Sequence, residues 1–260
     1  MKQTAISAAR EGGRILLQKF GGALSVSYKG EIDLVTEADR EAEIAIVEII
    51  RGTFPRHDVL AEEQDHGRNQ SRYRWIIDPL DGTTNFAHAF PFFAVSIALE
   101  IEREVHLGVV YNPVHQELFF AEKGKGAFLN DVQLRVSNTS ELNQALLATG
   151  FPYDRRDSPV NNYDHFYNLQ QAAQGCRRCG AASLDLAYTA AGRFDGYWEM
   201  KLKPWDVAAG KILVEEAGGL VSNFDGQALD IYGPECLASN GVLHGALLET
   251  LRRGRRPDVG

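Results

Sequence analysis

Two aspartates that follow a short apolar run are the residues of this sequence best suited to chemistry. Residues 75–86 read WIIDPLDGTTNF, in which WII predicts a buried strand, Pro79 is expected to end its hydrogen-bond ladder, and Gly82 permits an unusual backbone angle. The Thr-Thr-Asn that follows is typical of a helix start, whose free N–H groups favour an anion such as phosphate. Hard oxygen ligands beside an anion site suggest Mg²⁺ with a phosphate ester, and Asp78 and Asp81 would supply them.

A plainer interpretation is that Asp-Pro and Asp-Gly form common turns, in which both aspartates merely cap backbone N–H groups. Two further acidic sites favour the chemical interpretation. Residues 58–63 read DVLAEE, a second apolar run that ends in carboxylates, among them Glu62. Residues 203–210 read KPWDVAAG, which places Asp206 at the start of a helix. Three acidic sites at the ends of elements could therefore meet in the folded chain.

In these motifs the sequence resembles the inositol monophosphatase family of magnesium-dependent, lithium-sensitive phosphomonoesterases, in its bacterial type. The resemblance covers nearly the whole chain, and its ordered motifs make chance similarity very improbable. They are DLVTEAD at residues 33–39, AEE at 61–63, WIIDPLDGTTNF at 75–86, and KPWDVAAG at 203–210, which leads into EEAGG at 215–219. The resemblance implies a sugar-phosphatase-like fold, a layered α-β-α-β-α sandwich of the α+β or α/β class.

The same resemblance implies a metal centre built mainly from carboxylates. Glu62, Asp78 and the Leu80 carbonyl would hold a first Mg²⁺ ion, while Asp78, Asp81 and Asp206 would hold a second, so that Asp78 bridges the two. A third, weaker ion near Glu62 is expected, which makes two to three Mg²⁺ ions per site. Paired divalent ions activate water and neutralise phosphoryl oxygens. Without them the carboxylates repel one another, so the metal-free site should be partly protonated.

The expected catalytic residues are Asp39, Thr83, Glu62 and Lys29. In the family a Thr hydroxyl contacts the attacking water and an Asp accepts from that hydroxyl, and Thr83 and Asp39 match this pair. Both residues have an alternative role as helix caps, because Thr36 to Asp39 has the spacing of a capping box. Lys29, on a loop next to Gly30, matches a mobile basic residue near the metals, although a lone Lys is usually solvated surface.

Residues that bind the substrate are expected in both halves of the chain. The candidates are Asp81, Gly82, Thr83, Ala182, Glu199, Lys203 and Asp206. The N–H groups of Gly82 and Thr83 would point at the phosphate. By resemblance, Glu199 binds hydroxyls of a polyol and the Ala182 N–H meets the substrate, although a strand-end charge and a packed helix start are the alternatives. Lys203 stands where animal members have His, which leaves the alcohol open.

Inositol monophosphate is the substrate that the resemblance favours, with direct in-line attack by activated water. Fructose bisphosphate, histidinol phosphate and nucleotide phosphates are the alternatives, because relatives with much the same metal motifs hydrolyse them. A regulatory binding protein on the same fold is the competing hypothesis from another class. The presence of every metal ligand, together with Asp39 and Thr83, argues against it. The family also implies a homodimer.

Composition indicates a globular protein with a substantial core, since the 260 residues are 44% hydrophobic and 24% charged. A net charge of −8 and a pI near 5.4 argue against nucleic-acid or anionic-membrane partners, which favour a basic face. We expect neither a signal peptide nor a membrane-spanning segment, so a cytoplasmic location is the simplest interpretation. The CxxC of Cys176 and Cys179 is expected to form part of a strand with partly buried thiols rather than a redox or zinc site.

Two halves are expected, packed as one rigid unit with the site between them, because no flexible linker lies near residue 136. Residues 1–136 predict helices on an antiparallel sheet, with helices at 4–20 and from Thr36 to about residue 51, the latter burying Ile44, Val47 and Ile50. Residues 137–260 predict an α/β arrangement. Its strands are expected at 145–149, 194–199 and 220–222, and its helices at 161–173, 183–191, 206–217 and 242–251.

Overall fold

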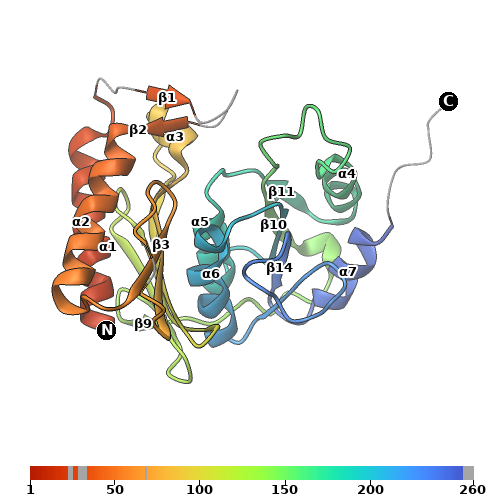
Figure 1. Cartoon of the computed structure of the whole chain (residues 1–260). Helices are drawn as coiled ribbons and strands as arrows, with labels where there is room; N and C mark the ends of the chain where they lie inside the picture. The colour runs from red at the N-terminus through yellow and green to blue at the C-terminus, as the bar shows by residue number, and fades with distance from the viewer. Residues whose placement is uncertain (23–25, 29–33, 68, 254–260) are drawn as a thin grey trace.

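Helices and sheets alternate as α-β-α-β-α in this computed structural model, which describes residues 1–22, 26–28, 34–67 and 69–253 (Figure 1). The helices are α1 (Lys2–Lys19), α2 (Glu37–Thr53), α3 (Thr83–Ala87), α4 (Tyr163–Ala172), α5 (Ala182–Ala190), α6 (Pro204–Glu216) and α7 (His244–Leu251). Helices α1 and α2 cover the outer face of one sheet, α5 and α6 lie between the two large sheets, and α4 and α7 cover the second. The expected layered sandwich is confirmed.

The strands form two large sheets and one small sheet. They are β1 (Val26–Tyr28), β2 (Leu34–Thr36), β3 (Asp58–Ala61), β4 (Tyr73–Asp81), β5 (Ala94–Ile101), β6 (Glu104–Asn112), β7 (Glu117–Glu122), β8 (Ala127–Leu129), β9 (Val132–Gln133), β10 (Leu146–Thr149), β11 (Gly175–Arg177), β12 (Gly196–Met200), β13 (Leu220–Ser222) and β14 (Glu235–Ser239). A seven-stranded sheet has the order β3-β4-β5-β6-β7-β8-β9, a five-stranded sheet has the order β11-β10-β12-β14-β13, and β1 pairs with β2. The division of the chain near residue 136 stays a prediction.

The first sheet corrects the expectation that it is antiparallel throughout. Strands β3 and β4 run parallel, with Val59 opposite Trp75, while β4 to β9 are antiparallel to their neighbours. The connection of residues 62–72 is long enough to bring the chain back to the end of the sheet at which β3 begins. As a result, the carboxyl ends of β3 and β4 meet at one edge of the sheet.

Strand β4 also corrects the expectation that Pro79 ends the ladder. Its pairing with β5 shifts register between Asp78 and Asp81 and then resumes, with Asp81 opposite Ala94. Proline lacks an N–H group, so it is tolerated in a sheet at such an irregularity. The irregularity keeps both aspartates within β4, and the expectation of irregular backbone around them is confirmed.

The second sheet is mixed, because one antiparallel strand, β14, lies between β12 and β13. Strand β10 runs parallel to β11 and β12, whereas β14 is antiparallel to both β12 and β13. Strand β14 was not predicted, because its five residues follow a turn-rich stretch and leave no clear periodicity. Cys176 lies in β11, as expected, whereas Cys179 lies beyond the end of that strand; both are partly buried, and the three cysteines are free.

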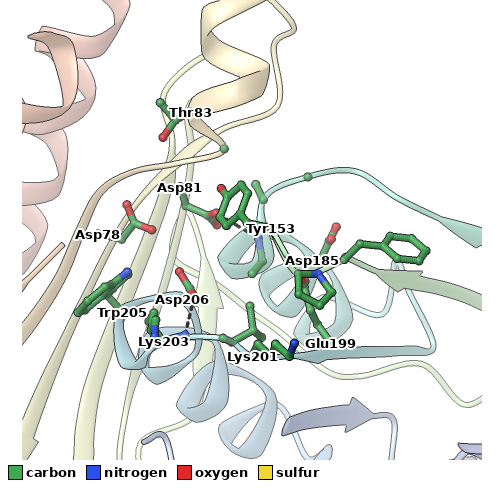
Figure 2. A pocket seen from close by; sticks show the side chains of 18 of the residues that line it. Asp78, Asp81, Thr83, Tyr153, Asp185, Glu199, Lys201, Lys203, Trp205 and Asp206 are labelled. Carbon is green, nitrogen blue, oxygen red and sulfur yellow. Dashed lines mark hydrogen bonds between the residues drawn. The ribbon is translucent and has the colours of Figure 1, made fainter. Parts of the chain in front are cut away.

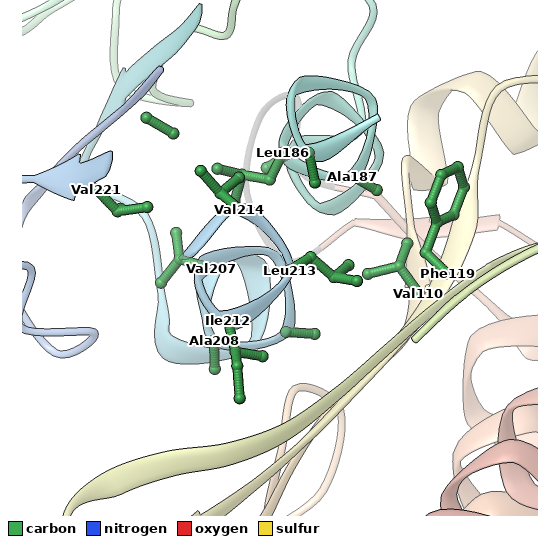
Figure 3. Packing of buried hydrophobic residues seen from close by; sticks show 14 of the residues in the cluster. Val110, Phe119, Leu186, Ala187, Val207, Ala208, Ile212, Leu213, Val214 and Val221 are labelled. Carbon is green, nitrogen blue, oxygen red and sulfur yellow. The ribbon is translucent and has the colours of Figure 1, made fainter. Parts of the chain in front are cut away.

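A shared hydrophobic layer holds the two large sheets together. Helix α6 buries apolar side chains on opposite faces, with Ile212 and Leu213 near the first sheet and Val214 near α5 (Figure 3). A helix that is apolar on several sides is typical of such a central position. Gly108 of β6 lets this helix approach closely, because a Cβ there would lie 2.7 Å from the Ala209 carbonyl oxygen.

Helix α2 begins as predicted, and it buries Val47 and Ile50 as expected but not Ile44. The Thr36 hydroxyl accepts from the Ala38 N–H and the Asp39 carboxylate accepts from the Thr36 N–H, so the predicted capping box is confirmed. Ile44, expected inside, is 46% exposed, and Glu43 beside it is fully buried. The buried face therefore contains two carboxylates, those of Asp39 and Glu43. No helix of the described residues is both long and apolar enough to cross a membrane.

Candidate active site

A cavity of about 430 Å³ gathers most of the candidate site residues (Figure 2). Those that line it are Glu62, Asp78, Leu80, Asp81, Gly82, Thr83, Ala182, Glu199, Lys203 and Asp206. They come from the edge where β3 and β4 end, from the start of α6, and from β12 and α5 of the second half. Asp39 lies behind Thr83, which it contacts. Lys29 falls outside the described residues, so its expected role stays a prediction.

Asp78 is at the centre of the acidic group. Its side chain is buried, and its Oδ1 accepts a hydrogen bond of 2.9 Å from the Leu80 N–H across the irregularity in β4. Burial raises its pKa well above the ordinary value, and the charges of Glu62, Asp81 and Asp206 raise it further. Mutual repulsion of this kind is relieved by protons or by cations.

Asp81 is turned toward the first residues of α5. Its Oδ1 accepts from the Ala182 N–H at 3.2 Å, and its Oδ2 accepts from the Ser183 N–H at 2.7 Å and the Ser183 hydroxyl at 2.5 Å. Burial raises the pKa of Asp81 to about 6, although the Ser183 bonds lower it. Ser183 was not predicted, because a small hydroxyl next to Ala182 is the only sign of it in the sequence. Ala182 directs its N–H to Asp81 here, so its substrate contact stays a prediction.

Asp206 lies in the first turn of α6, as predicted. Its Oδ2 accepts from the Lys203 N–H at 2.7 Å, a bond that closes the start of the helix after Pro204. Desolvation, followed by the charges of Asp81 and Glu62, raises its pKa well above the ordinary value. The Lys203 side chain is exposed and lines the same cavity.

The acidic side chains line the same cavity, but they do not form a complete set of ligands around one point. Among the described residues, no three Asp, Glu, His or Cys side chains lie close enough together to hold one ion. The reason is visible in Asp81 and Asp206, whose carboxylates accept from backbone N–H groups. The donor set still fits Mg²⁺, since it consists of hard oxygens whose charges oppose one another. The ligand assignment stays a prediction.

Asp39 and Thr83 contact each other, and Asp39 also closes the capping box of α2, while the catalytic role of the pair stays a prediction. Asp39 accepts from Thr36 through Oδ2 and from the Thr83 hydroxyl through Oδ1 at 3.1 Å. The same hydroxyl lies 3.1 Å from the Leu80 carbonyl oxygen, and it donates to one of the two at a time. Burial raises the pKa of Asp39 to about 6. Thr83 is not a helix cap, because Gly82, in the left-handed conformation at φ 94°, holds that position.

Glu199 stands on the opposite wall, at the end of β12. The Tyr197 hydroxyl donates to its Oε2 at 2.6 Å, and Gly150 faces its carboxylate so closely that an added Cβ would collide with both oxygens. Burial raises the pKa of Glu199 to about 7. Asp185 of α5 also lines the cavity, and its buried Oδ1 has no hydrogen-bond partner among the residues that the structure describes. Gly150 and Asp185 were not predicted, because their place in the cavity depends on packing between distant segments.

Comparisons with known proteins agree with this geometry. The sequence profile of the Inositol monophosphatase family matches residues 1–256. An inositol-1-monophosphatase of Synechocystis is 47% identical over 96% of this chain and 88% of its own length, and a Nus factor SuhB of Pseudomonas aeruginosa is 44% identical over 100% of this chain and 98% of its own. A solved inositol monophosphatase from Anabaena superposes with a TM-score of 0.90 at 46% identity, covering 99% and 96% of the two chains.

Fold, cavity and relatives together define a phosphoric monoester hydrolase that acts on small phosphate esters, similar to inositol-1-monophosphatase. The chain belongs to the inositol monophosphatase family. Membership confirms the resemblance that the four sequence motifs carried.

Proposed function

We propose that the chain hydrolyses inositol monophosphate to inositol and phosphate in a Mg²⁺-dependent reaction. The observation that carries this proposal is one cavity that is lined both by the acidic group around Asp78 and by Glu199 of the second sheet. A solved structure described as SaIMPase-II with inositol monophosphate bound supports it, at 28% identity and a TM-score of 0.81. An IMPase/NADP phosphatase complexed with Mg²⁺ and phosphate supports the metal, at 27% identity and a TM-score of 0.81.

Glu62, Asp78 and the Leu80 carbonyl would hold one Mg²⁺ ion, and Asp78, Asp81 and Asp206 would hold another, with two to three ions per site. When bound, the ions supply positive charge that activates a water and neutralises the phosphoryl oxygens. Asp78 suits the bridging position, because three other carboxylates act on it. Asp81 and Asp206 would share or release their present N–H partners on binding.

Thr83 would orient the attacking water. When its hydroxyl donates to Asp39, the lone pairs of the hydroxyl oxygen are left to accept a hydrogen bond from water. Asp39 cannot swing away, because its other oxygen is fixed by the N–H and hydroxyl of Thr36. The N–H groups of Gly82 and Thr83 would face the phosphate, and Lys29 would approach from its loop.

The alcohol would be bound by Glu199, whose carboxylate Tyr197 and Gly150 hold in place. An acceptor on a polyol-facing wall suits vicinal hydroxyls. Lys203 adds a positive charge at the rim of the cavity, where a second anionic group would be attracted. Fructose bisphosphate, histidinol phosphate and nucleotide phosphates are therefore the comparison substrates.

Phosphate release from inositol 1-phosphate, fructose 1,6-bisphosphate, histidinol phosphate and NADP tests the proposal, with and without Mg²⁺. We expect the highest kcat/KM for inositol 1-phosphate, loss of turnover in EDTA, and inhibition by Li⁺. Turnover that persists in EDTA would contradict the metal assignment. A higher kcat/KM for another ester would replace the substrate and leave the chemistry standing.

A regulatory role is the second candidate, and the names of several relatives favour it. Proteins 41% identical to this chain in Escherichia coli and Salmonella typhimurium are named Nus factor SuhB. An absence of turnover on every ester of the panel would support this role over catalysis. We also propose a homodimer, which light scattering tests; a monomer at all concentrations would exclude it. A cytoplasmic location stays a prediction.

A further inference from the structure

The loop that carries Glu62 has no regular structure of its own. Among the described residues from 62 to 72, none belongs to a helix or strand before β4 begins. A loop without ladder hydrogen bonds takes its shape from the side chains that bind its backbone. The bonds that hold the backbone on either side of Glu62 therefore contribute to its position.

Asp58 of β3 accepts from the Asn69 N–H near the far end of this loop, whereas the contacts nearest Glu62 come from α2, and Glu43 makes two of them. The Glu43 Oε2 accepts from the Glu63 N–H at 2.8 Å, directly after the candidate ligand Glu62, and its Oε1 lies 2.9 Å from His66 Nε2. The Glu43 side chain is 0% exposed and that of His66 is 10% exposed. About two turns further along the helix, Arg51 donates to the His66 carbonyl oxygen at 2.6 Å.

A carboxylate at the buried position of Glu43 lowers the stability of the fold unless hydrogen-bond donors compensate for its lost hydration. A buried carboxylate is unfavourable without hydrogen-bond donors, and burial raises the pKa of Glu43 while the Glu63 N–H and His66 lower it. An apolar residue would suit the packed face of α2 better, as Ile46 and Ile50 show. The two donors of the loop are what make the buried carboxylate tolerable, so the carboxylate and the loop fix each other.

The same face of α2 also fixes the other side of the reaction centre. Asp39 and Glu43 are four residues apart, so they lie on one face about 6 Å apart along the axis. Asp39 holds the Thr83 hydroxyl, and Glu43 holds the backbone next to Glu62. One rigid helix thereby sets the distance between the water-orienting hydroxyl and a metal ligand.

We propose that Glu43, assisted by His66, is a positioning residue that places Glu62 for Mg²⁺ binding. This inference rests on the proposed function, because it takes Glu62 to be a metal ligand. Glu43 itself touches neither substrate nor ion. Its effect passes through the Glu63 backbone, and it is independent of the bonds that place Asp78, Asp81 and Asp206.

Calorimetric titration of the metal-free protein with Mg²⁺ tests the proposal directly. We expect Glu43→Ala to weaken Mg²⁺ binding by about 10- to 100-fold, the range seen when partners of metal ligands are removed. Glu43→Gln should rescue most of the loss, because its carboxamide oxygen accepts from the Glu63 N–H and its NH₂ group donates to neutral His66. Glu48→Ala is the matched control, an exposed acid on the same helix, and should bind Mg²⁺ like the wild type.

Mg²⁺ titration of Glu62→Gln and of Glu43→Ala distinguishes a failure of the proposed metal ligand from a failure of the positioning role of Glu43. Glu62→Gln should weaken Mg²⁺ binding; if it does not, the ligand assignment fails and the inference fails with it. If Glu62→Gln weakens binding while Glu43→Ala binds Mg²⁺ like the wild type, the inference alone is overturned. Should Glu43→Ala not fold, His66→Ala replaces it, and unchanged Mg²⁺ binding in that variant overturns the proposal.

Discussion

Asp81→Asn should make the metal-free protein more stable while it removes the activity. Asp81 is 8% exposed, and burial disfavours its charged form, so its charge opposes folding when no cation is present. Asparagine has nearly the same shape and no charge. With its side-chain oxygen placed where Oδ2 now lies, it keeps both Ser183 bonds, whereas its NH₂ group cannot accept from the Ala182 N–H, which now donates to Asp81 at 3.2 Å.

The magnitude follows from the shifted pKa. Burial raises the pKa of Asp81 from 3.8 to about 6, a difference worth about 3 kcal/mol of unfolding free energy once the group is ionised in both states. The lost hydrogen bond costs about 1 kcal/mol. We therefore expect Asp81→Asn to be about 2 kcal/mol more stable than the wild type at pH 8 in EDTA, which raises Tm by roughly 4–8 °C in a chain of this size.

The pH dependence has a definite sign. Because the pKa of Asp81 is higher in the folded protein, the folded state binds the proton more tightly, and stability falls as the pH rises from about 4 to above 6. With a pKa of about 6, the destabilisation of about 3 kcal/mol at pH 8 shrinks to about 1.5 kcal/mol at pH 5. The advantage of the variant should shrink with it.

Differential scanning calorimetry at pH 8 and pH 5, each in EDTA and in saturating Mg²⁺, measures all of these differences. In Mg²⁺ the order should reverse, because the wild type gains the binding free energy of the ion and the variant loses a ligand. Phosphate release by the variant should fall by about 10²-fold or more. A variant less stable than the wild type at pH 8 in EDTA would refute the inference that the buried charge of Asp81 opposes folding.

Three further predictions concern other parts of the cavity. Thr83→Val removes the hydroxyl that Asp39 orients, so kcat should fall by about 10²-fold or more while Thr83→Ser retains most of it; equal rates for both variants would contradict the role of the hydroxyl. Gly150→Ala should displace the Glu199 carboxylate and raise KM for a polyol phosphate more than it lowers kcat; initial-rate kinetics showing an unchanged KM would argue against Glu199 as the alcohol contact. Burial raises the pKa of the Cys176 thiol to about 11 and that of the Cys179 thiol to about 12, so both thiols are poor nucleophiles. Oxidised glutathione should therefore leave kcat/KM unchanged. Inactivation by oxidised glutathione that dithiothreitol reverses would favour the redox interpretation.

The sequence predicted those features that depend on neighbouring residues and missed those that depend on distant ones. The capping box at Thr36 and the helix start that contains Asp206 are local, and both are present. The bond between Asp81 and Ser183 joins positions 102 residues apart, which no local pattern records. The burial of Glu43 was not predicted, because its neighbour Ile44 fitted the expected apolar stripe better. The hydrogen bond that makes a buried Glu43 possible comes from the Glu63 N–H, 20 residues away.

The expectation of an antiparallel first sheet did not account for the parallel pairing of β3 with β4, which brings the carboxyl ends of both strands to the same edge of the sheet. An antiparallel β3 would have carried its terminal acids to the far edge of the sheet, about 13 Å away for a strand of four residues. Parallel pairing needs a long return connection, and that connection is the loop held by Glu43. Topology thus created both the meeting of the carboxylates and the need for a residue to secure the loop.

The two walls of the cavity belong to different sheets, and this separation bears on how such an enzyme diversifies. The acids that would handle phosphate come from the first sheet and the central helix α6, whereas Glu199 and Gly150 lie on β12 and just after β10 of the second sheet. Replacements on the second sheet can thus retune the choice of leaving alcohol without disturbing the hydrolytic apparatus. A new substrate would then be reached by single substitutions on the second sheet, and each intermediate variant would keep the residues proposed for hydrolysis.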